Sequence, residues 1–329
     1  MTIREQLEQR ERETLSPFAC LSAEQDKRER METPCPYRTA FQRDRDRILH
    51  CNAFRRLKRK TQVFLSPVGD HYRTRLTHTL EVAQIARTIS RALFLNEDLT
   101  EAIALGHDLG HSPFGHSGEA VLHQICPHGY RHYEQSVRVV TYIEKQGTGL
   151  NLTEAVRDGI LCHTNRIAAT REGYIVRLAD RIAYLNHDIE DAIRAGILRP
   201  EDLPKEAVAR LGSTKTERIT TLVSSVVAQG AEQIGMAEDC LQAQEQLHTF
   251  MFSNVYYNPV AKREEKKAEQ LIEQLYSYFV KHPEKMSEEY QQIAKRFDLH
   301  RAVCDYISGM SDGYAIDLYT ELFVPKNWK

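Results

Sequence analysis

The chain has 329 residues, of which 41% are hydrophobic and 27% are charged, a balance typical of soluble globular proteins. Its 44 Lys and Arg nearly cancel its 46 Asp and Glu, so the overall charge gives no argument for binding to nucleic acid or to a membrane surface. There is no run of about 18 apolar residues and no apolar signal-peptide core, and the seven dispersed cysteines include no CxxC pair, so we expect a cytoplasmic protein with reduced thiols and no membrane partner.

The first part of the chain differs in pattern from the rest. Residues 1–40 are rich in charge and contain three prolines, and we expect them to form an irregular arm. Beyond them, apolar residues recur at helical spacing, and no strand-like alternation with hairpin turns stands out. The segment "THTLEVAQIARTISRALF" places His78 one turn before Val82, on the apolar face of the predicted helix.

The same periodicity continues along the chain. In "DLTEAIALGHDLG" we expect Asp98 to be the N-cap, His107 to face inward and Gly110 to end the helix. A longer helix is predicted in "GYIVRLADRIAYLNHDIEDAIRAGIL", ending near Gly196. Further helices are predicted over 153–163, 215–230, 237–253, 262–281 and 288–308.

These elements predict an all-α protein. No internal repeat, low-complexity tract or obvious linker divides the chain. We therefore expect a single structural domain in which the arm over 1–40 precedes a core over 41–200, with a C-terminal helical lobe over 201–329 packed on that core.

Three segments place His or Asp on the inward faces of predicted helices: "RLTHTLEV", "GHDLGHSPFGHSGE" and "RLADRIAYLNHDIEDA". Burying such groups alone costs several kcal/mol, so they must be paired or must coordinate a metal. Two imidazoles and two carboxylates suit Mg, Mn, Fe, Ni or Zn with open water positions, and do not suit a thiolate zinc site. Each residue taken alone is better explained as a satisfied core side chain. The candidate ligands are His78, His107, Asp108 and Asp180.

Together these segments resemble the HD-domain phosphohydrolases, whose metal ligands follow the order H…HD…D. The resemblance is sharpest to the deoxyguanosine triphosphate triphosphohydrolase-like subfamily, because "HDLGHSPFGHSGE" is similar to its extended HD motif and "ADRIAYLNHDIEDA" to its last metal-ligand helix. The segments "RDRDRILHCNAFRRLKRKTQVF" and "CDYISGMSDGYAIDLYTELF" are similar to its N- and C-terminal signatures, so the resemblance covers roughly 36–325.

The resemblance implies a helical HD-domain bundle with an additional C-terminal lobe, usually working as a homo-oligomer. It implies a metal-dependent enzyme that cleaves dGTP or several deoxynucleoside triphosphates (dNTPs) into a deoxynucleoside and tripolyphosphate. The four candidate ligands match the family's metal-binding positions. A bound dNTP or a nucleic acid is also possible as an allosteric partner.

The resemblance further implies that His116 and Glu119 lie beside the attacked α-phosphorus and that His111 and His132 contact the phosphates. A histidine with a pKa near neutrality can transfer a proton to the departing 5′-oxygen. We assign this step to His116, held by Glu119 three residues later. Glu119 is alternatively a carboxylate that favours the N-terminus of a helix.

Substrate contacts are implied at five more positions. Arg75 matches an arginine near the sugar and phosphates, and Gln62 falls beside the sugar and base. Tyr184 and Asp188 follow the last metal ligand at intervals of four residues, on one helix face, and match residues that hold the deoxyribose. A ring against the sugar would disfavour a 2′-hydroxyl, although Tyr184 is alternatively a core aromatic. Arg181 stands where some relatives carry a phosphate-binding lysine.

A basic cluster precedes the first ligand segment. It is explained either as a solvated face, as a subunit contact, or as a site for nucleic acid, an allosteric nucleotide or the substrate's phosphates. The cluster comprises Arg55, Arg56, Lys58, Arg59 and Lys60.

Two other functions remain open at this point. An HD site could act on a nucleoside monophosphate, an alarmone or a cyclic dinucleotide, or the chain could be a non-enzymatic nucleotide sensor or nucleic-acid-binding protein. His163 either approaches the site from the helix before the Asp180 helix or is a structural histidine. The sequence assigns no role to Asp312 or Tyr314, and it does not determine base preference, the metal or oligomer size.

Overall fold

The computed structural model describes residues 1–62, 73–256 and 259–326. Across these ranges the chain forms helices and connecting loops, and the one β-bridge, between Thr61 and Thr74, is isolated and belongs to no sheet. This confirms the predicted all-α class. No helix in the described ranges is both long and apolar enough to cross a membrane. The chain divides into two compact units, each assembled from three separate segments.

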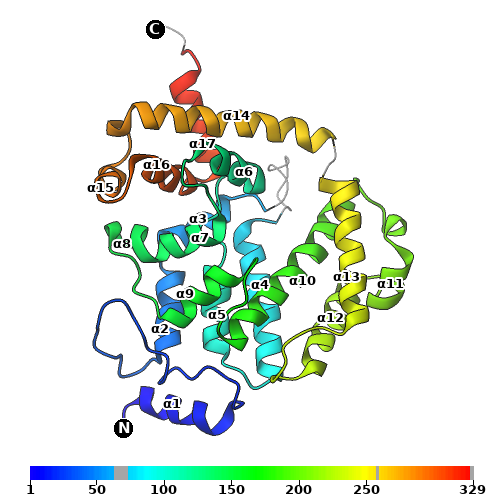
Figure 1. Cartoon of the computed structure of the whole chain (residues 1–329). Coiled ribbons are helices and arrows are strands. Elements are labelled where there is room, and N and C mark those ends of the chain that lie inside the picture. The colour runs from blue at the N-terminus through cyan, green and yellow to red at the C-terminus, as the bar shows by residue number, and fades with distance from the viewer. Residues whose placement is uncertain (63–72, 257–258, 327–329) are drawn as a thin grey trace. The chain divides into compact units, whose positions relative to one another are not determined.

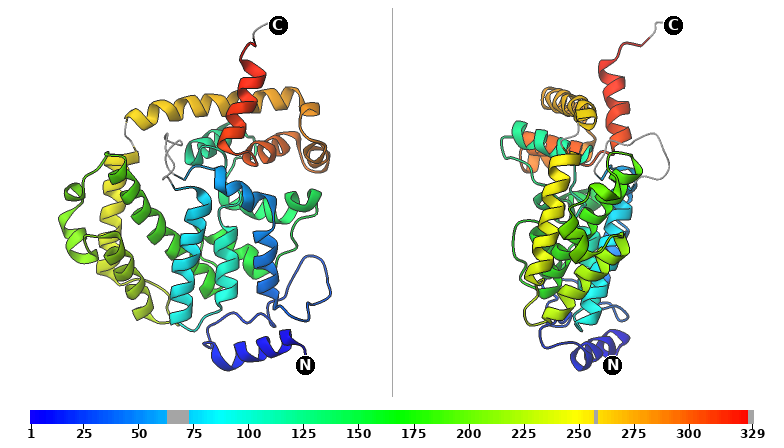
Figure 2. Two further views of the ribbon diagram at one scale, coloured as in Figure 1. Left: turned by 180° about the vertical axis from the view of Figure 1, so that it is seen from behind. Right: turned by 90° about the vertical axis from the view of Figure 1, so that its right-hand side faces the viewer.

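The first unit comprises Met1–Leu49, His78–His107 and Asn151–Asn258. Helix α5 packs against α2, α9 and α10, and these helices lie side by side in both views of the molecule (Figures 1 and 2). Their apolar faces are buried against one another. The helices are α1 (Ile3–Thr14), α2 (Ala40–Leu49), α4 (Arg75–Ala92, from His78 onward), α5 (Glu97–Gly106), α9 (Glu154–Cys162), α10 (Arg171–Arg194), η3 (Pro200–Asp202), α11 (Lys205–Leu211), α12 (Lys215–Gln229), α13 (Glu238–Met251) and the π-helical turn η4 (Phe252–Tyr256).

Helix α1 lies in the segment that we expected to be irregular. Thr2 and Glu5 form a capping box, in which the Thr2 side chain accepts from the Glu5 backbone N–H and the Glu5 carboxylate accepts from the Thr2 N–H. Arg4 and Glu8 form an ion pair one turn apart, 2.7 Å between Nη1 and Oε1. These local polar contacts favour a helix that contains few apolar residues.

Helix α5 begins and ends earlier than the sequence predicts. The N-cap is Asn96, not Asp98, because the Asn96 side chain accepts from the Leu99 N–H at 3.2 Å. The Asp98 carboxylate instead accepts a hydrogen bond from the Gln42 side chain. The helix ends at Gly106, not at Gly110, and His107 is its C-cap. His107 therefore lies at the helix terminus, where it is not confined to one face.

The second unit comprises His50–Thr77, Asp108–Leu150 and Pro259–Lys329. Helix α14 lies against α6, α16 and α17 (Figure 1). The helix predicted over 288–308 is two helices, because the Asp298 side chain accepts from the Arg301 N–H and starts a new one. The helices are α3 (Asn52–Arg56), η1 (Leu57–Arg59), α6 (Gly115–Ile125), α7 (His132–Arg138), η2 (Val139–Ile143), α8 (Glu144–Gly147), α14 (Pro259–Lys281), η5 (Pro283–Lys285), α15 (Glu288–Arg296), α16 (Leu299–Ser308) and α17 (Asp312–Phe323).

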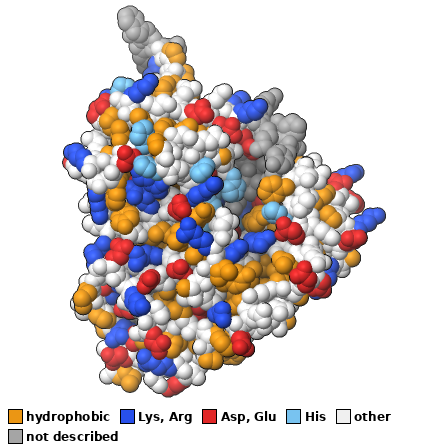
Figure 3. Space-filling model, viewed as in Figure 1, with side chains coloured by type: hydrophobic (Ala, Val, Ile, Leu, Met, Phe, Trp, Pro, Cys, Tyr) orange, Lys and Arg blue, Asp and Glu red, His pale blue; other side chains and the backbone are white. Residues whose placement is uncertain are grey.

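Basic, acidic and hydrophobic side chains are interspersed on the face of the molecule shown in Figure 3. This mixture agrees with the near balance of charges in the sequence.

The contact between α5 and α9 can be tested at a glycine. A Cβ on Gly159 would lie 2.4 Å from Cδ1 of Ile103, a side chain that is fully buried. We expect Gly159→Ala to lower the stability by about 1–3 kcal/mol, because the packed isoleucine has little room to move. Thermal denaturation measures the change. Gly313→Ala is the matched control, because a Cβ there meets nothing within 4 Å, and equal melting temperatures for both variants would contradict the described packing.

Candidate active site

Three of the four predicted metal ligands converge within the first unit. His78 lies on α4, His107 caps α5 and Asp180 lies on α10. Oδ1 of Asp180 is 3.0 Å from Nε2 of His78 and 3.8 Å from Nε2 of His107. Two adjacent ligands of an ion bound at about 2.1 Å are themselves about 3 Å apart. The spacing therefore fits donors that face a common ion.

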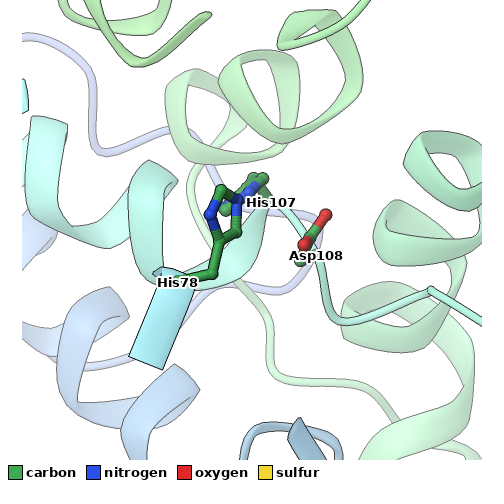
Figure 4. A group of neighbouring side chains, drawn as sticks. All are labelled: His78, His107 and Asp108. Carbon is green, nitrogen blue, oxygen red and sulfur yellow. The ribbon is translucent and has the colours of Figure 1, made fainter. Parts of the chain in front are cut away.

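The fourth predicted ligand, Asp108, follows His107 directly in the chain. His78, His107 and Asp108 are all buried, and they offer ligand atoms that lie within 4.8 Å of one another. Figure 4 shows the two imidazole rings side by side, with the Asp108 side chain next to them. His78 and His107 thus belong to both groups of donors. A mixed set of imidazoles and carboxylates suits a divalent ion such as Mn, Fe, Ni, Zn or Mg.

The tautomer of His107 leaves Nε2 as the nitrogen that can bind a metal. Its Nδ1 lies 2.6 Å from the carbonyl oxygen of Ala104, and since a carbonyl only accepts, Nδ1 must carry the proton. The lone pair is then on Nε2, the nitrogen that faces Asp180. Donation from the second ring nitrogen to a carbonyl is a common arrangement for metal-binding histidines. His107 therefore fits the metal that its segment predicts.

His163 repeats this arrangement at the end of α9. Its Nδ1 lies 2.7 Å from the carbonyl oxygen of Ile160, and its ring centroid is 5.0 Å from that of His107. The same argument places the lone pair of His163 on Nε2. The sequence left this residue open between an approach to the site and a structural histidine, and the structure places its ring beside that of the metal-ligand candidate His107.

In the second unit, Arg75 and Asp108 form a buried ion pair, 2.8 Å between Nη1 and Oδ2. Nη2 of Arg75 also donates to the backbone carbonyl of Gln62 at 3.4 Å. Nε of Arg75 is buried and has no hydrogen-bond acceptor among the described residues. A buried guanidinium with a donor to spare is suited to bind an oxyanion. The Gln62 side chain is half-buried.

His111 and His132 lie together beside Asp108. Their rings are stacked, with centroids 4.0 Å apart and planes 14° apart, and His111 Nε2 is 3.3 Å from Oδ1 of Asp108. These three residues also offer ligand atoms within 4.8 Å. Parallel stacked rings, however, direct their lone pairs side by side and not toward one ion. Burial, followed by the charge of Arg75, lowers the pKa of His111 well below its usual value.

Glu119 is held more closely by His132 than by His116. Oε2 of Glu119 is 2.9 Å from Nδ1 of His132 and 3.6 Å from Nδ1 of His116, and the Glu119 carboxylate also accepts from the His132 backbone N–H. Burial opposes ionisation, but the hydrogen bonds with His116 and His132 outweigh it and lower the pKa of Glu119 well below its usual range. The His116 side chain is 80% exposed, whereas that of His132 is 10% exposed.

Tyr184 and Asp188 lie one and two turns beyond Asp180 on α10, as predicted. Asp188 is buried and Tyr184 is half-buried. Burial, and then the charges of Asp180 and Asp188, raise the pKa of Tyr184, so its hydroxyl stays protonated and can donate. Arg181 is paired with Glu245 of α13 at 3.2 Å.

The HD domain family model matches residues 75–185, and the phosphohydrolase-associated domain model matches residues 234–321. A deoxyguanosinetriphosphate triphosphohydrolase-like protein of Caldanaerobacter subterraneus subsp. tengcongensis is 55% identical, with 100% of this chain and 98% of that protein covered. A protein with the same description from Clostridium perfringens is 50% identical, with 99% of each covered.

This chain belongs to the deoxyguanosinetriphosphate triphosphohydrolase-like family of HD-domain phosphohydrolases. The family suggested by the sequence motifs is thereby confirmed. A solved structure of a phosphohydrolase from Bacteroides thetaiotaomicron has a TM-score of 0.53 and 17% identity, and the match covers 84% of this chain and 68% of that one. That likeness shows the fold alone.

In this HD-domain phosphohydrolase, the basic cluster does not act as one surface. Arg55, Arg56, Lys58 and Arg59 are exposed, but Lys60 is buried and donates to two backbone carbonyls. No local signal distinguishes Lys60 from its neighbours, because its acceptors lie far away in the sequence.

Sequence reasoning also missed His248 of α13. Its ring centroid is 6.1 Å from that of Tyr184 and 4.7 Å from that of Phe252. The spacing of Glu245, His248 and Phe252 on one helical face was the available signal, but nothing in the sequence linked that face to α10.

Metal binding can be tested without measuring activity. We expect His78→Ala and His107→Ala each to weaken Mn²⁺ binding by at least about 100-fold, because each removes a donor and leaves the other ligands incomplete. Isothermal titration calorimetry with Mn²⁺ measures the affinity. His282→Ala is the control, since its side chain is 49% exposed and its contacts are with Glu284 and the Tyr278 ring, away from the candidate ligands. Unchanged affinity in both ligand variants would contradict the assignment.

Proposed function

We propose that this chain hydrolyses deoxynucleoside triphosphates, dGTP among them, to a deoxynucleoside and tripolyphosphate by attack of water at the α-phosphorus. The observation that carries the proposal is the convergence of His78, His107 and Asp180, together with the buried ion pair between Arg75 and Asp108, the residue that follows His107 directly in the chain. We infer that metal binding and phosphate binding meet at this His-Asp dipeptide. The names of the relatives support the substrate class.

The phosphate contacts follow from the charges of the site. A divalent ion bound by the His/Asp set would polarise a phosphoryl oxygen and lower the pKa of a bound water. Arg75 supplies a fixed positive charge with a spare N–H donor, and His111 and His132 stack beside Asp108. A triphosphate carries several negative charges and favours protonation of nearby histidines. Arg75, His111 and His132 are therefore our proposed phosphate contacts.

We assign proton transfer to the departing 5′-oxygen of the nucleoside to His116. Its exposed ring is free to meet a substrate, and Glu119 lies 3.6 Å from its Nδ1. His132 anchors the same carboxylate from the buried side, 2.9 Å away. Glu119 thus has a fixed position and a low pKa, and an ionised carboxylate stabilises an imidazolium. We propose that His116 is the proton donor and that Glu119 orients it.

Selection of the sugar is assigned to α10. The protonated Tyr184 hydroxyl and its ring would face the 2′-carbon, so that a 2′-hydroxyl would collide with the ring, and Asp188 would accept from the 3′-hydroxyl. Arg181 would contact the phosphates after release from Glu245, and Gln62 would lie beside the sugar and base. We also propose a cytoplasmic homo-oligomer. All seven cysteines are free, as in a reducing compartment.

The point of attack can be read from the products. With dGTP and Mn²⁺ in H₂¹⁸O, we expect deoxyguanosine and tripolyphosphate, with the label in tripolyphosphate, because water attacks phosphorus and the 5′-oxygen leaves with the nucleoside. Mass spectrometry of both products measures this. Asp180→Ala, which removes a metal-ligand candidate, should form no product. Appearance of dGMP and pyrophosphate would contradict the point of attack, and labelled deoxyguanosine would indicate attack at carbon.

The proton donor can be tested by comparing two histidines of α6 and its neighbourhood. We expect His116→Ala to lower kcat by about 10²–10⁴-fold with little change in KM, the size typical of losing a general acid. Steady-state assays with dGTP measure both constants. His128→Ala is the control, because that side chain is 53% exposed and pairs with Asp298. If His116→Ala retained kcat, the assigned proton donor would be wrong.

A further inference from the structure

Lys60 connects three segments of the second unit that are far apart in sequence. Its side chain is buried, and Nζ donates to the carbonyl of His111 at 2.5 Å and to the carbonyl of Ser308 at 2.7 Å. The Lys60 carbonyl accepts from the Arg75 N–H at 3.1 Å. One buried lysine thus ties together the segment before α4, the loop after Asp108 and the end of α16.

Asp312 connects the same three segments, but its carboxylate accepts hydrogen bonds where Lys60 Nζ donates them. Its Oδ2 accepts from the Thr61 backbone N–H at 2.9 Å and also from the Thr61 hydroxyl. Its Oδ1 accepts from the Phe114 backbone N–H at 3.0 Å. The carboxylate is buried at the first turn of α17, and each of its oxygens serves a different segment. Neither oxygen can be replaced by a donor without losing a contact.

The Phe114 N–H belongs to an unfavourable turn. Phe114 has φ 61° and ψ 27°, in the left-handed region, and it precedes α6 without a side-chain cap. Bulky residues avoid this region, so the turn needs support from outside. Gly115 also has a positive φ, of 58°, and a Cβ there would lie 3.4 Å from Nη2 of Arg75. The turn therefore brings the backbone against Arg75 immediately before His116.

We propose that Asp312 is a positioning residue that, together with Lys60, holds the Phe114–Gly115 turn and so sets where α6 presents His116 to the substrate. The proposal rests on the proposed function for the role of His116. Asp312 acts through the Phe114 N–H and contacts no reacting atom. Its partner Thr61 pairs with Thr74, next to Arg75, so the same carboxylate also steadies the segment that lies beside this arginine.

The C-terminal segment has a structural role in this arrangement. Ser308 and Asp312 both lie within the match to the phosphohydrolase-associated domain, residues 234–321, and His111 and Phe114 lie within the HD match, residues 75–185. The hydrogen bonds from Lys60 and to Asp312 join these two regions directly at the turn. The associated segment would thus act as a support for the HD loop.

Two variants separate this role from general stability. Asp312→Asn keeps the shape of the side chain but turns one acceptor into a donor, so either the Thr61 or the Phe114 N–H loses its partner. Asp312→Ala removes both. Asp317→Asn is the matched control, because Asp317 is exposed on the same helix. Thr61→Val, which removes only the hydroxyl, is a milder second probe of the same contact.

The first measurement is hydrogen–deuterium exchange of the substrate-free protein. We expect exchange at the amides of Phe114 and Thr61 to accelerate by about tenfold or more in Asp312→Ala, with a partial effect in Asp312→Asn and none in Asp317→Asn. Unchanged exchange at both amides in Asp312→Ala would overturn the proposal. This result does not depend on which substrate the enzyme uses.

The second measurement is dGTP hydrolysis. We expect Asp312→Asn to lower kcat by about 10- to 100-fold, the size typical of misplacing a reacting group by about 1 Å, with KM changed less than about threefold and the melting temperature nearly kept. A purely structural role would instead lower the melting temperature and leave the kcat of the folded fraction unchanged, and that outcome would overturn the proposal. Failure of the wild type to hydrolyse any dNTP would count against the proposed function, while the exchange result would still decide the role of Asp312 in the turn.

Discussion

Arg75 and Asp108 face each other at 2.8 Å with side chains that are 2% and 5% exposed. A charge buried this deeply must be paired, because leaving either partner alone costs several kcal/mol. Arg75 begins α4, one turn before His78, and Asp108 follows His107. The ion pair therefore joins the start of α4 to the residue that follows His107, and the charge that we propose for phosphate binding depends on this carboxylate.

Backbone carbonyls at helix ends fix the orientation of two histidine rings. The last carbonyls of a helix lack intrahelical donors, and α5 and α9 use this in the same way: each is capped by a histidine whose Nδ1 donates to the carbonyl three residues earlier. Both rings are thereby fixed in the tautomer that leaves Nε2 as the acceptor. Lys60 does the same over a longer range for the carbonyl of Ser308 at the end of α16, and it also donates to the carbonyl of His111 in the loop before α6.

The four histidines around the HD loop differ in exposure, which agrees with the separate tasks that we propose for them. His107 and His111 are buried, one held by a carbonyl and the other stacked on His132. His116 stands outside, within reach of the Glu119 carboxylate that His132 anchors. Sequence spacing paired His116 with Glu119 because they are three residues apart on a helix, but the closer partner of Glu119 comes from α7, 13 positions away.

Helical periodicity was sufficient to predict the all-α class and most helices, and the resemblance to the HD motif named four candidate metal ligands, of which the structure brings His78, His107 and Asp180 close together. The periodicity is a local signal, because side chains three or four residues apart share a helix face whatever surrounds them. The start and end of α5, the break at Asp298, and the contacts of Lys60 and Asp312 were decided only by the tertiary structure. Thr61 and Asp312 are separated by 251 positions, and no periodicity in either segment specifies which buried N–H will meet which carboxylate once the chain has closed around them.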